Sequence, residues 1–267
     1  MSTGFDSGYF SRRYFSGTSG LLLPVPNKQF FPDEFEDRSR LTYYASLFNS
    51  IEVNSSFYKI PLGKTIANWS ATVPDSFRFT FKLFREITHQ KPAGTDKDLI
   101  RNFFAVIGNA GHKKGCLLVQ FPAKTDFDIA LLQELLFFIS ELNEEQHWRI
   151  CVEFRDIKWY CNPVLSLLES LNISLVIHDK PKSITPISQL HNNTIYIRFH
   201  GPAGDYRGSY STEILNQWAE KIFQWIQTGK TVFAYFNNTI GDAIQNLQTL
   251  NRLIDSRLAG MVQRQHQ

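Results

Sequence analysis

Residues 149–155 read RICVEFR, and the strict alternation of this stretch decides the fold. In a strand, Ile150 and Phe154 would point to one face, and Glu153 and Arg155 would point to the other. A strand of a parallel sheet is normally apolar on both faces, because helices cover one face and the core covers the other. Charged residues on one face therefore predict a strand with one face in a polar environment.

Seven more segments have the length and composition of strands. The eight segments are 15–20, 51–58, 77–83, 116–122, 149–155, 173–178, 194–200 and 231–237. Amphipathic helical stretches lie between most of them, the exception being the weak segment 180–190. Strands that alternate with helices predict a parallel sheet with right-handed crossovers. The count of eight matches an α/β fold, a single (β/α)8 TIM barrel, better than the alternative, a doubly wound open sheet.

The composition predicts one domain with a large core. The 267 residues are 43% hydrophobic and include 23 Phe, and no Ser/Gly-rich linker or charge run divides them. We expect a barrel domain over residues 14–256, an N-terminal tail at 1–13 and a C-terminal tail at 257–267. No secretion signal or membrane span is recognisable, and the three cysteines have no metal or disulfide spacing. The sequence therefore predicts a cytoplasmic protein, with oligomeric state left open.

The charge balance indicates the kind of partner. A net charge of +3 and a pI of about 8.7 fit an anionic ligand and fall short of a dedicated nucleic-acid binder. The expected partner is a small anionic substrate or phosphate. Nucleic acid is possible but not favoured, and neither a membrane nor a cofactor is expected.

The polar strand faces predict a polar barrel interior. If the apolar faces pack on helices, four cations (Arg78, Lys82, Arg155 and Arg198) and two carboxylates (Glu52 and Glu153) point inward. The interior then carries a net charge of +2 with the histidines neutral. Because such groups are costly to bury unless they are paired or serve a ligand, an anion is expected to complete the site. A salt-bridged plug without a ligand is the alternative.

Position along each strand separates stability from chemistry. Side chains near strand starts, such as Glu52 and Arg78, belong to the stability end of a barrel, and those near strand ends belong to its C-terminal rim. The rim residues are Lys82, Gln120, Glu153, Arg155, His178, His200 and Asn237.

The last strand leaves the barrel in an unusual turn, TVFAYFNNTIGDA at residues 231–243. Asn237, Asn238 and Thr239 follow its apolar run, and Gly241 leads into the final helix. Backbone N–H groups at a helix start favour an anion, and barrels commonly bind phosphate after strands seven and eight. An ordinary Asn/Thr cap is the alternative.

A series of motifs resembles a known family. SGTSG, YYASLFNSIEVNSSFYKIP, FRFTFKLFREITH, LLVQFP, VEFRDIKW, IRFHGPAGDYRGSYS and YFNNTIGDAIQN occur in this order over nearly the whole chain. Together they are similar to the domain of unknown function 72 family, the YecE-like proteins. The resemblance implies a TIM barrel and no established activity. One departure is Leu21, where the family commonly has Trp.

The favoured function is a metal-independent enzyme that acts on an anionic, phosphate- or sugar-containing substrate. Lys82, Arg155 and Arg198 would hold the charge, since guanidinium groups bind oxyanions bidentately. Glu153 or His200 would transfer protons, and Lys82 would alternatively form a Schiff base. The further candidate binding residues are Asn54, Tyr58, Gln120, His178, Trp159, Tyr206, Tyr210, Asn237, Asn238, Thr239 and Gly241.

Two alternatives belong to other classes. One is a nucleic-acid-processing barrel similar in architecture to endonuclease IV-type repair proteins, an analogy at the level of the fold. Against it, no motif such as H-E-x-x-H is present, and neighbouring cations would repel a metal ion. The other is a non-catalytic module that binds an anionic metabolite. In either case the loop GDYRGSY, residues 204–210, is a candidate lid.

Overall fold

A computed structural model describes residues 13–89, 96–145, 147–187 and 192–264, and eight strands lie in this part of the chain. The strands are β1 Tyr14–Thr18, β2 Ser50–Val53, β3 Arg78–Lys82, β4 Lys114–Phe121, β5 Arg149–Phe154, β6 Ser174–His178, β7 Thr194–Phe199 and β8 Thr231–Phe236. All hydrogen-bonded neighbours are parallel, in the order β1-β8-β7-β6-β5-β4-β3-β2. Because β1 also meets β2 through a bridge between Ser19 and Glu52, the sheet is nearly closed. The predicted TIM barrel is confirmed.

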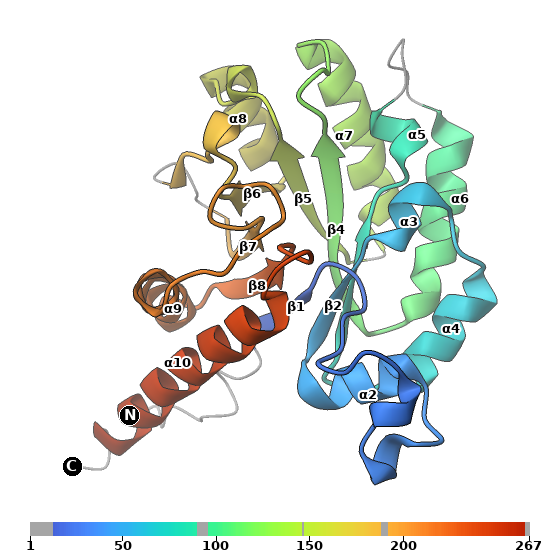
Figure 1. Cartoon of the computed structure of the whole chain (residues 1–267). Coiled ribbons are helices and arrows are strands. Elements are labelled where there is room, and N and C mark those ends of the chain that lie inside the picture. Colours follow the sequence, from blue (N-terminus) through green and yellow to red (C-terminus); the bar gives the residue numbers. More distant parts are fainter. Residues whose placement is uncertain (1–12, 90–95, 146, 188–191, 265–267) are drawn as a thin grey trace, which may run out of the picture.

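Helices cover the outside of the strands (Figure 1), with α4 and α6 on one side and α9 and α10 on the other. The α-helices in the described residues are α2 Arg40–Leu47, α3 Ser55–Tyr58, α4 Gly63–Ala71, α5 Arg85–Thr88, α6 Lys97–Ile107, α7 Ile129–Asn143, α8 Asn162–Ser170, α9 Thr212–Gln227 and α10 Ala243–Arg264. Ser39, Asp128 and Ser211 cap α2, α7 and α9 by accepting from the backbone N–H three residues on.

The interior of the barrel is divided into two halves. Its lower half is filled by an apolar cluster separate from the core between strands and helices. The cluster consists of Phe15, Cys116, Leu118, Cys151, Val176, Tyr196, Phe233 and Tyr235. At the strand starts, Arg78 and Arg149 lie over the rings of Phe15 and Phe233, each 5.5 Å from the ring centroid. Polar side chains are therefore concentrated in the upper half, near the carboxyl ends of the strands.

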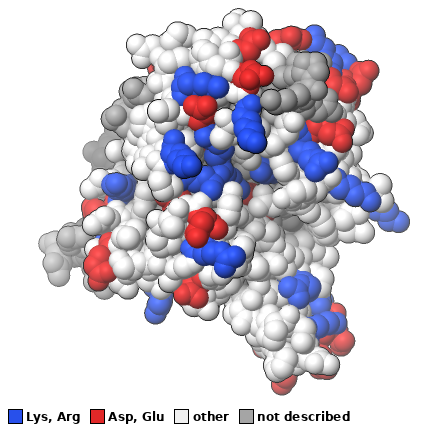
Figure 2. Space-filling model, turned by 45° about the horizontal axis from the view of Figure 1, so that its top comes forward, with Lys and Arg blue, Asp and Glu red and all other residues white. Residues whose placement is uncertain are grey.

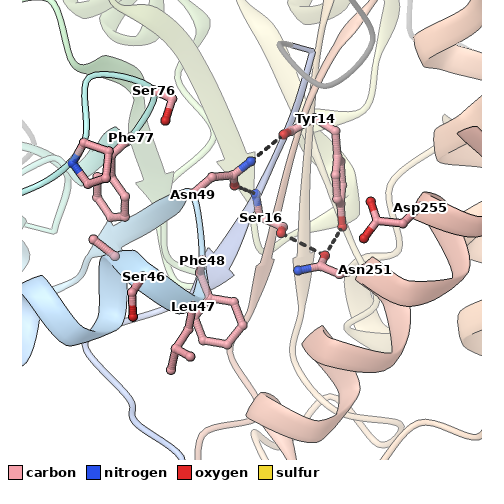
Figure 3. Close-up of a pocket in the computed structure, with 12 residues that line it drawn as sticks. Tyr14, Ser16, Ser46, Leu47, Phe48, Asn49, Ser76, Phe77, Asn251 and Asp255 are labelled. Carbon is pink, nitrogen blue, oxygen red and sulfur yellow. Dashed lines mark hydrogen bonds between the residues drawn. The ribbon is translucent and has the colours of Figure 1, made fainter. Parts of the chain in front are cut away.

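Side chains complete the seam between β1 and β2 where the two backbones do not pair. The Asn49 amide accepts a hydrogen bond from the Ser16 N–H and donates one to the Tyr14 carbonyl, both at 2.8 Å. This is the pair of bonds that a peptide group of a neighbouring parallel strand would make. Figure 3 shows Asn49 and Asn251 on either side of β1, in a pocket of about 280 Å³ at the start of the strand.

Higher along the same seam, the Tyr44 hydroxyl lies between the strands. It accepts from the Thr18 N–H at 2.7 Å and donates to the Ser50 carbonyl at 3.1 Å. Gly17 passes so close that a Cβ atom there would lie 1.9 Å from the Ser50 oxygen. β1 and the chain of β2 are thus joined by the side chains of Tyr44 and Asn49. The absence of a side chain at Gly17 lets the two strands approach closely.

Two elements end at other residues than predicted. β2 ends at Val53 rather than at residue 58, because the Ser56 hydroxyl donates to the carbonyls of both Val53 and Lys82 and turns the chain into α3. α10 continues to Arg264, through most of the predicted C-terminal tail. The weak segment after β6 contains the 3₁₀ turn Pro181–Ser183, and residues 188–191 lie outside the described part.

Candidate functional site

A buried ion network crosses the upper half of the barrel, centred on Arg198 of β7. Its Nη2 and Nη1 atoms lie 2.7 Å from Glu52 Oε1 of β2 and from Glu153 Oε2 of β5. Tyr196 and Ser19 also donate to the Glu52 carboxylate. Arg198 is 1% exposed and both glutamates are fully buried. Although burial favours the protonated acid, Arg198 and these hydroxyl donors hold the pKa of Glu52 below its ordinary value.

The network extends to the rim through Arg155 and His200. Arg155 Nε donates to the second oxygen of Glu153, and Arg155 Nη2 donates to His200 Nε2 at 3.0 Å. Since Nε2 is an acceptor, the proton of the neutral imidazole is on Nδ1, which faces Asp179 Oδ1 at 3.2 Å. Tyr210 donates to the other oxygen of Asp179. Each member thereby fixes the orientation of the next.

The ion pairs of this region balance. Arg198 and Arg155 are paired with Glu52 and Glu153, and Asp179 faces His200 at the rim. Arg78, which the sequence places inside with the other cations, lies at the opposite end and donates to the carbonyls of Asp75 and Phe77. The predicted net-positive interior is therefore not confirmed.

Two of the three predicted catalytic residues, Glu153 and His200, are buried and hydrogen-bonded within this network. Burial acts to raise the pKa of Glu153, but Arg155 and Arg198 hold that pKa well below its ordinary value, so the carboxylate stays ionised. Burial lowers the pKa of His200 to about 4, so the ring stays neutral. Both side chains are fully buried and both ring nitrogens of His200 are engaged. Neither residue is placed to exchange a proton with a substrate, and the fully paired Arg198 cannot hold an anion.

The buried neutral His200 should make the fold sensitive to mild acid. Its pKa rises from about 4 in the folded chain to 6.5 when unfolded, so unfolding takes up a proton in this interval. The contribution is complete above pH 6.5 and is lost as pH falls toward 4; between pH 7 and pH 5 we expect the unfolding free energy to drop by ~2 kcal/mol on this account. Denaturant unfolding at both values measures the drop, which His200→Gln should reduce and the exposed-site control His147→Gln should not. An unchanged drop in His200→Gln would contradict this assignment.

Among the residues that the structure describes, three polar side chains at the mouth of the barrel have no hydrogen-bond or ion-pair partner. Lys82 of β3, Gln120 of β4 and Asn237 after β8 are 9%, 7% and 8% exposed. Their positions continue the inward-facing series of their strands, above Thr80, Leu118 and Tyr235. Within the described residues their polar atoms make no hydrogen bond or ion pair, and these atoms are not sealed from solvent. Because buried polar groups are almost always paired, these three indicate a place for a ligand.

Lys82 is held in place by the turn that follows β2. Ser56 of α3 binds the Lys82 carbonyl at 2.7 Å, and the Lys82 Nζ lies 3.9 Å from the centroid of the Phe57 ring. Burial, with Arg198 adding a smaller effect, lowers the pKa of Lys82 to about 7. Nearby, burial and Lys82 lower the pKa of the half-buried His89 to about 4.

The loop after β7 adds Tyr206 to the mouth. Arg155 Nη1 lies 3.4 Å from the Tyr206 hydroxyl, and Lys180 Nζ lies 4.3 Å from the centroid of the Tyr206 ring. Burial would raise the pKa of Tyr206, but Arg155 and Lys180 together lower it. The residue has a φ of 70°, in the left-handed region that only special contacts maintain in a non-glycine residue. Figure 2 shows Lys and Arg side chains gathered over the middle of this face.

The turn after β8 holds the loop after β7 and does not provide a phosphate cradle. The N–H groups of Ile240, Gly241 and Asp242 donate to the carbonyls of Tyr206, Asn238 and Gly208. The fully buried Asn238 donates its amide to Gly208 and Asn246. A Cβ atom on Gly241 would lie 2.3 Å from the Gly208 oxygen. The structure does not support the predicted anion at Asn238 and Gly241, because the Asn238 amide donates to Gly208 and Asn246 and the Gly241 N–H donates to the Asn238 carbonyl. Thr239 is half-buried beside them.

Other predicted binding residues lie elsewhere or serve packing. His178 binds the Phe154 carbonyl and the Tyr160 hydroxyl through Nε2 and accepts from the Lys180 N–H through Nδ1. Trp159 is 2% exposed and stacks on Phe154 at 5.0 Å.

Of three more predicted contacts, two lie outside the interior and the third belongs to the buried network. Tyr58 is 68% exposed at the end of α3. Asn54 lines an apolar pocket of about 280 Å³ with Leu21 and Trp69. Tyr210 is buried and donates to Asp179.

The structure also adds residues that the sequence did not single out. Asp179 and Lys180 follow β6 directly. Residues at this position of a barrel strand reach the C-terminal rim, so their place in the sequence could have marked them as site residues. In the described ranges, no group of three or more His, Cys, Asp or Glu side chains is arranged to hold a metal ion. Over the same ranges, no helix has both the length and the apolar character needed to cross a bilayer.

The eight parallel strands and the helices around them place this protein in the class of TIM barrels. The chain belongs to the family described as "Protein of unknown function DUF72", whose model matches residues 15–267. It is 24% identical over 265 residues to the UPF0759 protein YunF of Bacillus subtilis, covering 88% of this chain and 93% of the relative. It is 29% identical over 110 residues to the UPF0759 protein YecE of Escherichia coli K12, covering 41% of this chain and 40% of the relative.

Solved structures agree with the fold. A DUF72 family protein of Enterococcus faecalis V583 matches with a TM-score of 0.73 and 23% identity, over 91% of this chain and 95% of that one. A DUF72 family protein of Thermotoga maritima MSB8 matches with a TM-score of 0.67 and 22% identity, over 91% and 99%. SacUVDE, at 8% identity and a TM-score of 0.52 over 92% and 99%, shares the barrel alone.

Proposed function

We propose that this barrel is an enzyme that binds a small anionic, phosphate- or sugar-containing molecule at its C-terminal mouth and acts on it without an obligatory metal. The observation that supports this most directly is the set of Lys82, Gln120 and Asn237, each more than nine-tenths buried and each without a partner in the described chain. An ammonium group and two amides match the oxygen atoms of a phosphate, a carboxylate or a sugar.

Arg155 and Tyr206 extend the same site to the rim. The Arg155 side chain is 11% exposed, and its bonds to Glu153, His200 and Tyr206 leave two of its five N–H groups without an acceptor among the described residues. The buried Glu153 carboxylate beneath holds this guanidinium in a fixed orientation, so little entropy is lost when an anion binds. Preorganised donors of this kind also stabilise charge that develops during a reaction.

The test compares stability and binding in the same variants. Gln120→Leu and Lys82→Met replace an unpaired polar group by an apolar one of similar size. We expect both variants to keep or raise the thermal midpoint of the ligand-free protein, because an unpaired buried polar group is removed. Both should lose most of the stabilisation that inorganic phosphate or a sugar phosphate gives to the unaltered chain, with affinity at least about tenfold lower.

Lys158→Met, which removes an exposed lysine of the same face, is the matched control and should bind normally. Variants that lose stability without any ligand would show that these groups support the fold instead. Stabilisation by short oligonucleotides with a steep salt dependence, and not by phosphate, would replace the proposal by a nucleic-acid function. Binding without turnover of any sugar phosphate would leave a non-catalytic module.

A further inference from the structure

Two lysines are deeply buried in the described part of the chain, and their surroundings differ in one decisive respect. Lys113 is 4% exposed, and its Nζ donates to the carbonyls of Ser70 and Val73 at 2.6 and 2.7 Å and lies 3.4 Å from Asp75. Every proton of this ammonium group has an acceptor. Lys82 is 9% exposed, and its Nζ has no oxygen acceptor among the residues that the structure describes.

Nearby carboxylates do not supply the missing acceptor. Glu52 and Glu153 influence Lys82 electrostatically, but their oxygens are bound by Arg198, Arg155 and the hydroxyl donors. Nζ lies over the face of the Phe57 ring, which attracts an ammonium ion weakly and accepts no conventional hydrogen bond. Lys82 thus stands at the mouth of the barrel with an aromatic face, and no oxygen acceptor among the described residues, to balance its charge.

The charged surroundings act in the same direction. The charged or titratable groups that influence Lys82 are Arg198, Glu153, Glu52 and Arg155, with His89 on the chain after β3. Burial and the two arginines lower the pKa of Lys82 to about 7, more than the two carboxylates raise it. A substantial fraction of the side chain is therefore unprotonated at neutral pH, as a nucleophilic lysine requires.

Proton transfer is a less suitable task for this group. Acid–base chemistry commonly uses two groups, and the two predicted proton-transfer residues, Glu153 and His200, are sealed in the ion network. Addition to a carbonyl carbon needs one amine and an oriented substrate. Gln120 and Asn237 offer hydrogen bonds to substrate oxygens at the same mouth, and Arg155 offers a charge for an anionic end.

We propose that Lys82 Nζ is the nucleophile that forms a Schiff base with an aldehyde or ketone substrate carrying a phosphate or carboxylate group. This rests on the proposed function and names its substrate class. In the first step the amine lone pair forms a C–N bond, and the carbonyl π electrons move to oxygen. The carbinolamine then loses its C–O bond, and the oxygen leaves as water with the two protons of the amine, which yields the imine.

Reductive trapping tests the proposal on the full-length protein. Glycolaldehyde phosphate is incubated with the protein at pH 7 in the presence of cyanoborohydride, which reduces an imine to a stable secondary amine, and the modified lysine is located by peptide mass spectrometry. We expect one dominant adduct on Lys82, with at least tenfold lower occupancy on the paired Lys113 and the exposed Lys158. Lys82→Arg should abolish this adduct, and mapping of the unaltered protein gives the same information if that variant does not fold.

The outcomes separate the two proposals. Glycolaldehyde without phosphate should label Lys82 at least tenfold more slowly. Equal labelling by the two aldehydes would contradict the anion site while supporting the nucleophile. Thermal stabilisation by glycolaldehyde phosphate without trapping at Lys82, or trapping spread over exposed lysines, would overturn the nucleophile and leave the anion site in place.

Discussion

Replacing Arg198 by Met should lower the free energy of unfolding by about 3–5 kcal/mol, the usual cost of removing one member of a buried ion pair. The reason is geometric. Arg198 satisfies Glu52 with two of its nitrogens and Glu153 with a third, and all three side chains are almost fully buried. Without the guanidinium, the buried Glu52 would lose its ion pair and Glu153 would keep only Arg155. Urea unfolding followed by circular dichroism measures the loss.

Two companion variants make this prediction specific. Adding Glu52→Gln to Arg198→Met should restore much of the lost stability, since Glu52 then carries no uncompensated charge while Glu153 keeps its ion pair with Arg155. Arg257→Met removes an arginine of α10 whose Nε lies 3.2 Å from the exposed Glu220, and it should cost less than ~1 kcal/mol. A loss of similar size in Arg198→Met and Arg257→Met would contradict the structural role of the network.

Gly17→Ala should have a comparable effect at the seam of the barrel. A Cβ atom there would lie 1.9 Å from the Ser50 carbonyl oxygen and 2.7 Å from the Tyr44 hydroxyl, so β1 and β2 would have to separate. Overpacking typically costs ~1–3 kcal/mol and occasionally more. Because the obstacle here is backbone that cannot rotate away, we expect the upper end, about 3 kcal/mol or greater. Thermal and denaturant unfolding both report this change.

Gly20→Ala is the matched control at the end of the same segment. Gly20 has a φ of 90°, and a Cβ atom there would have no neighbour within 4 Å. Only the strain of the backbone conformation then counts, roughly 1–2 kcal/mol. If Gly17→Ala proved no more harmful than Gly20→Ala, the two strands would not be as tightly joined as the structure indicates.

The alternation of side chains was enough to predict the barrel and the inward face of each strand. Arg155, Arg198 and Lys82 do lie on the inner side of the strands or at their ends, as the period of two requires. The pattern failed beyond Val53, where alternating polar residues predicted a continued strand. The Ser56 hydroxyl instead lies 2.7 Å from the carbonyl oxygens of Val53 and Lys82, and the chain enters a helix there.

The pairing of charges could not be predicted from the pattern. Alternation indicates that Glu153 and Arg198 both point into the barrel. Only the distance between their atoms shows that they form an ion pair, and that Lys82 has no such pair within the described residues. The turn after β8 failed for a related reason. Its donors are taken by a loop more than thirty residues earlier in the chain, at Tyr206 and Gly208, and local sequence carries no signal of such a remote acceptor.

The seam also has a chemical consequence for the ageing of the molecule. At Asn49 a side-chain amide performs the task of a main-chain peptide group, and its Nδ2 is the donor to the Tyr14 carbonyl. Hydrolysis of that amide to a carboxylate would replace a donor by an acceptor and set two oxygens against each other. A single spontaneous deamidation would thus remove the bond that holds the start of β1 on the side of β2, while the pairing of β1 with β8 would remain. A barrel closed by backbone alone has no bond of this kind to lose.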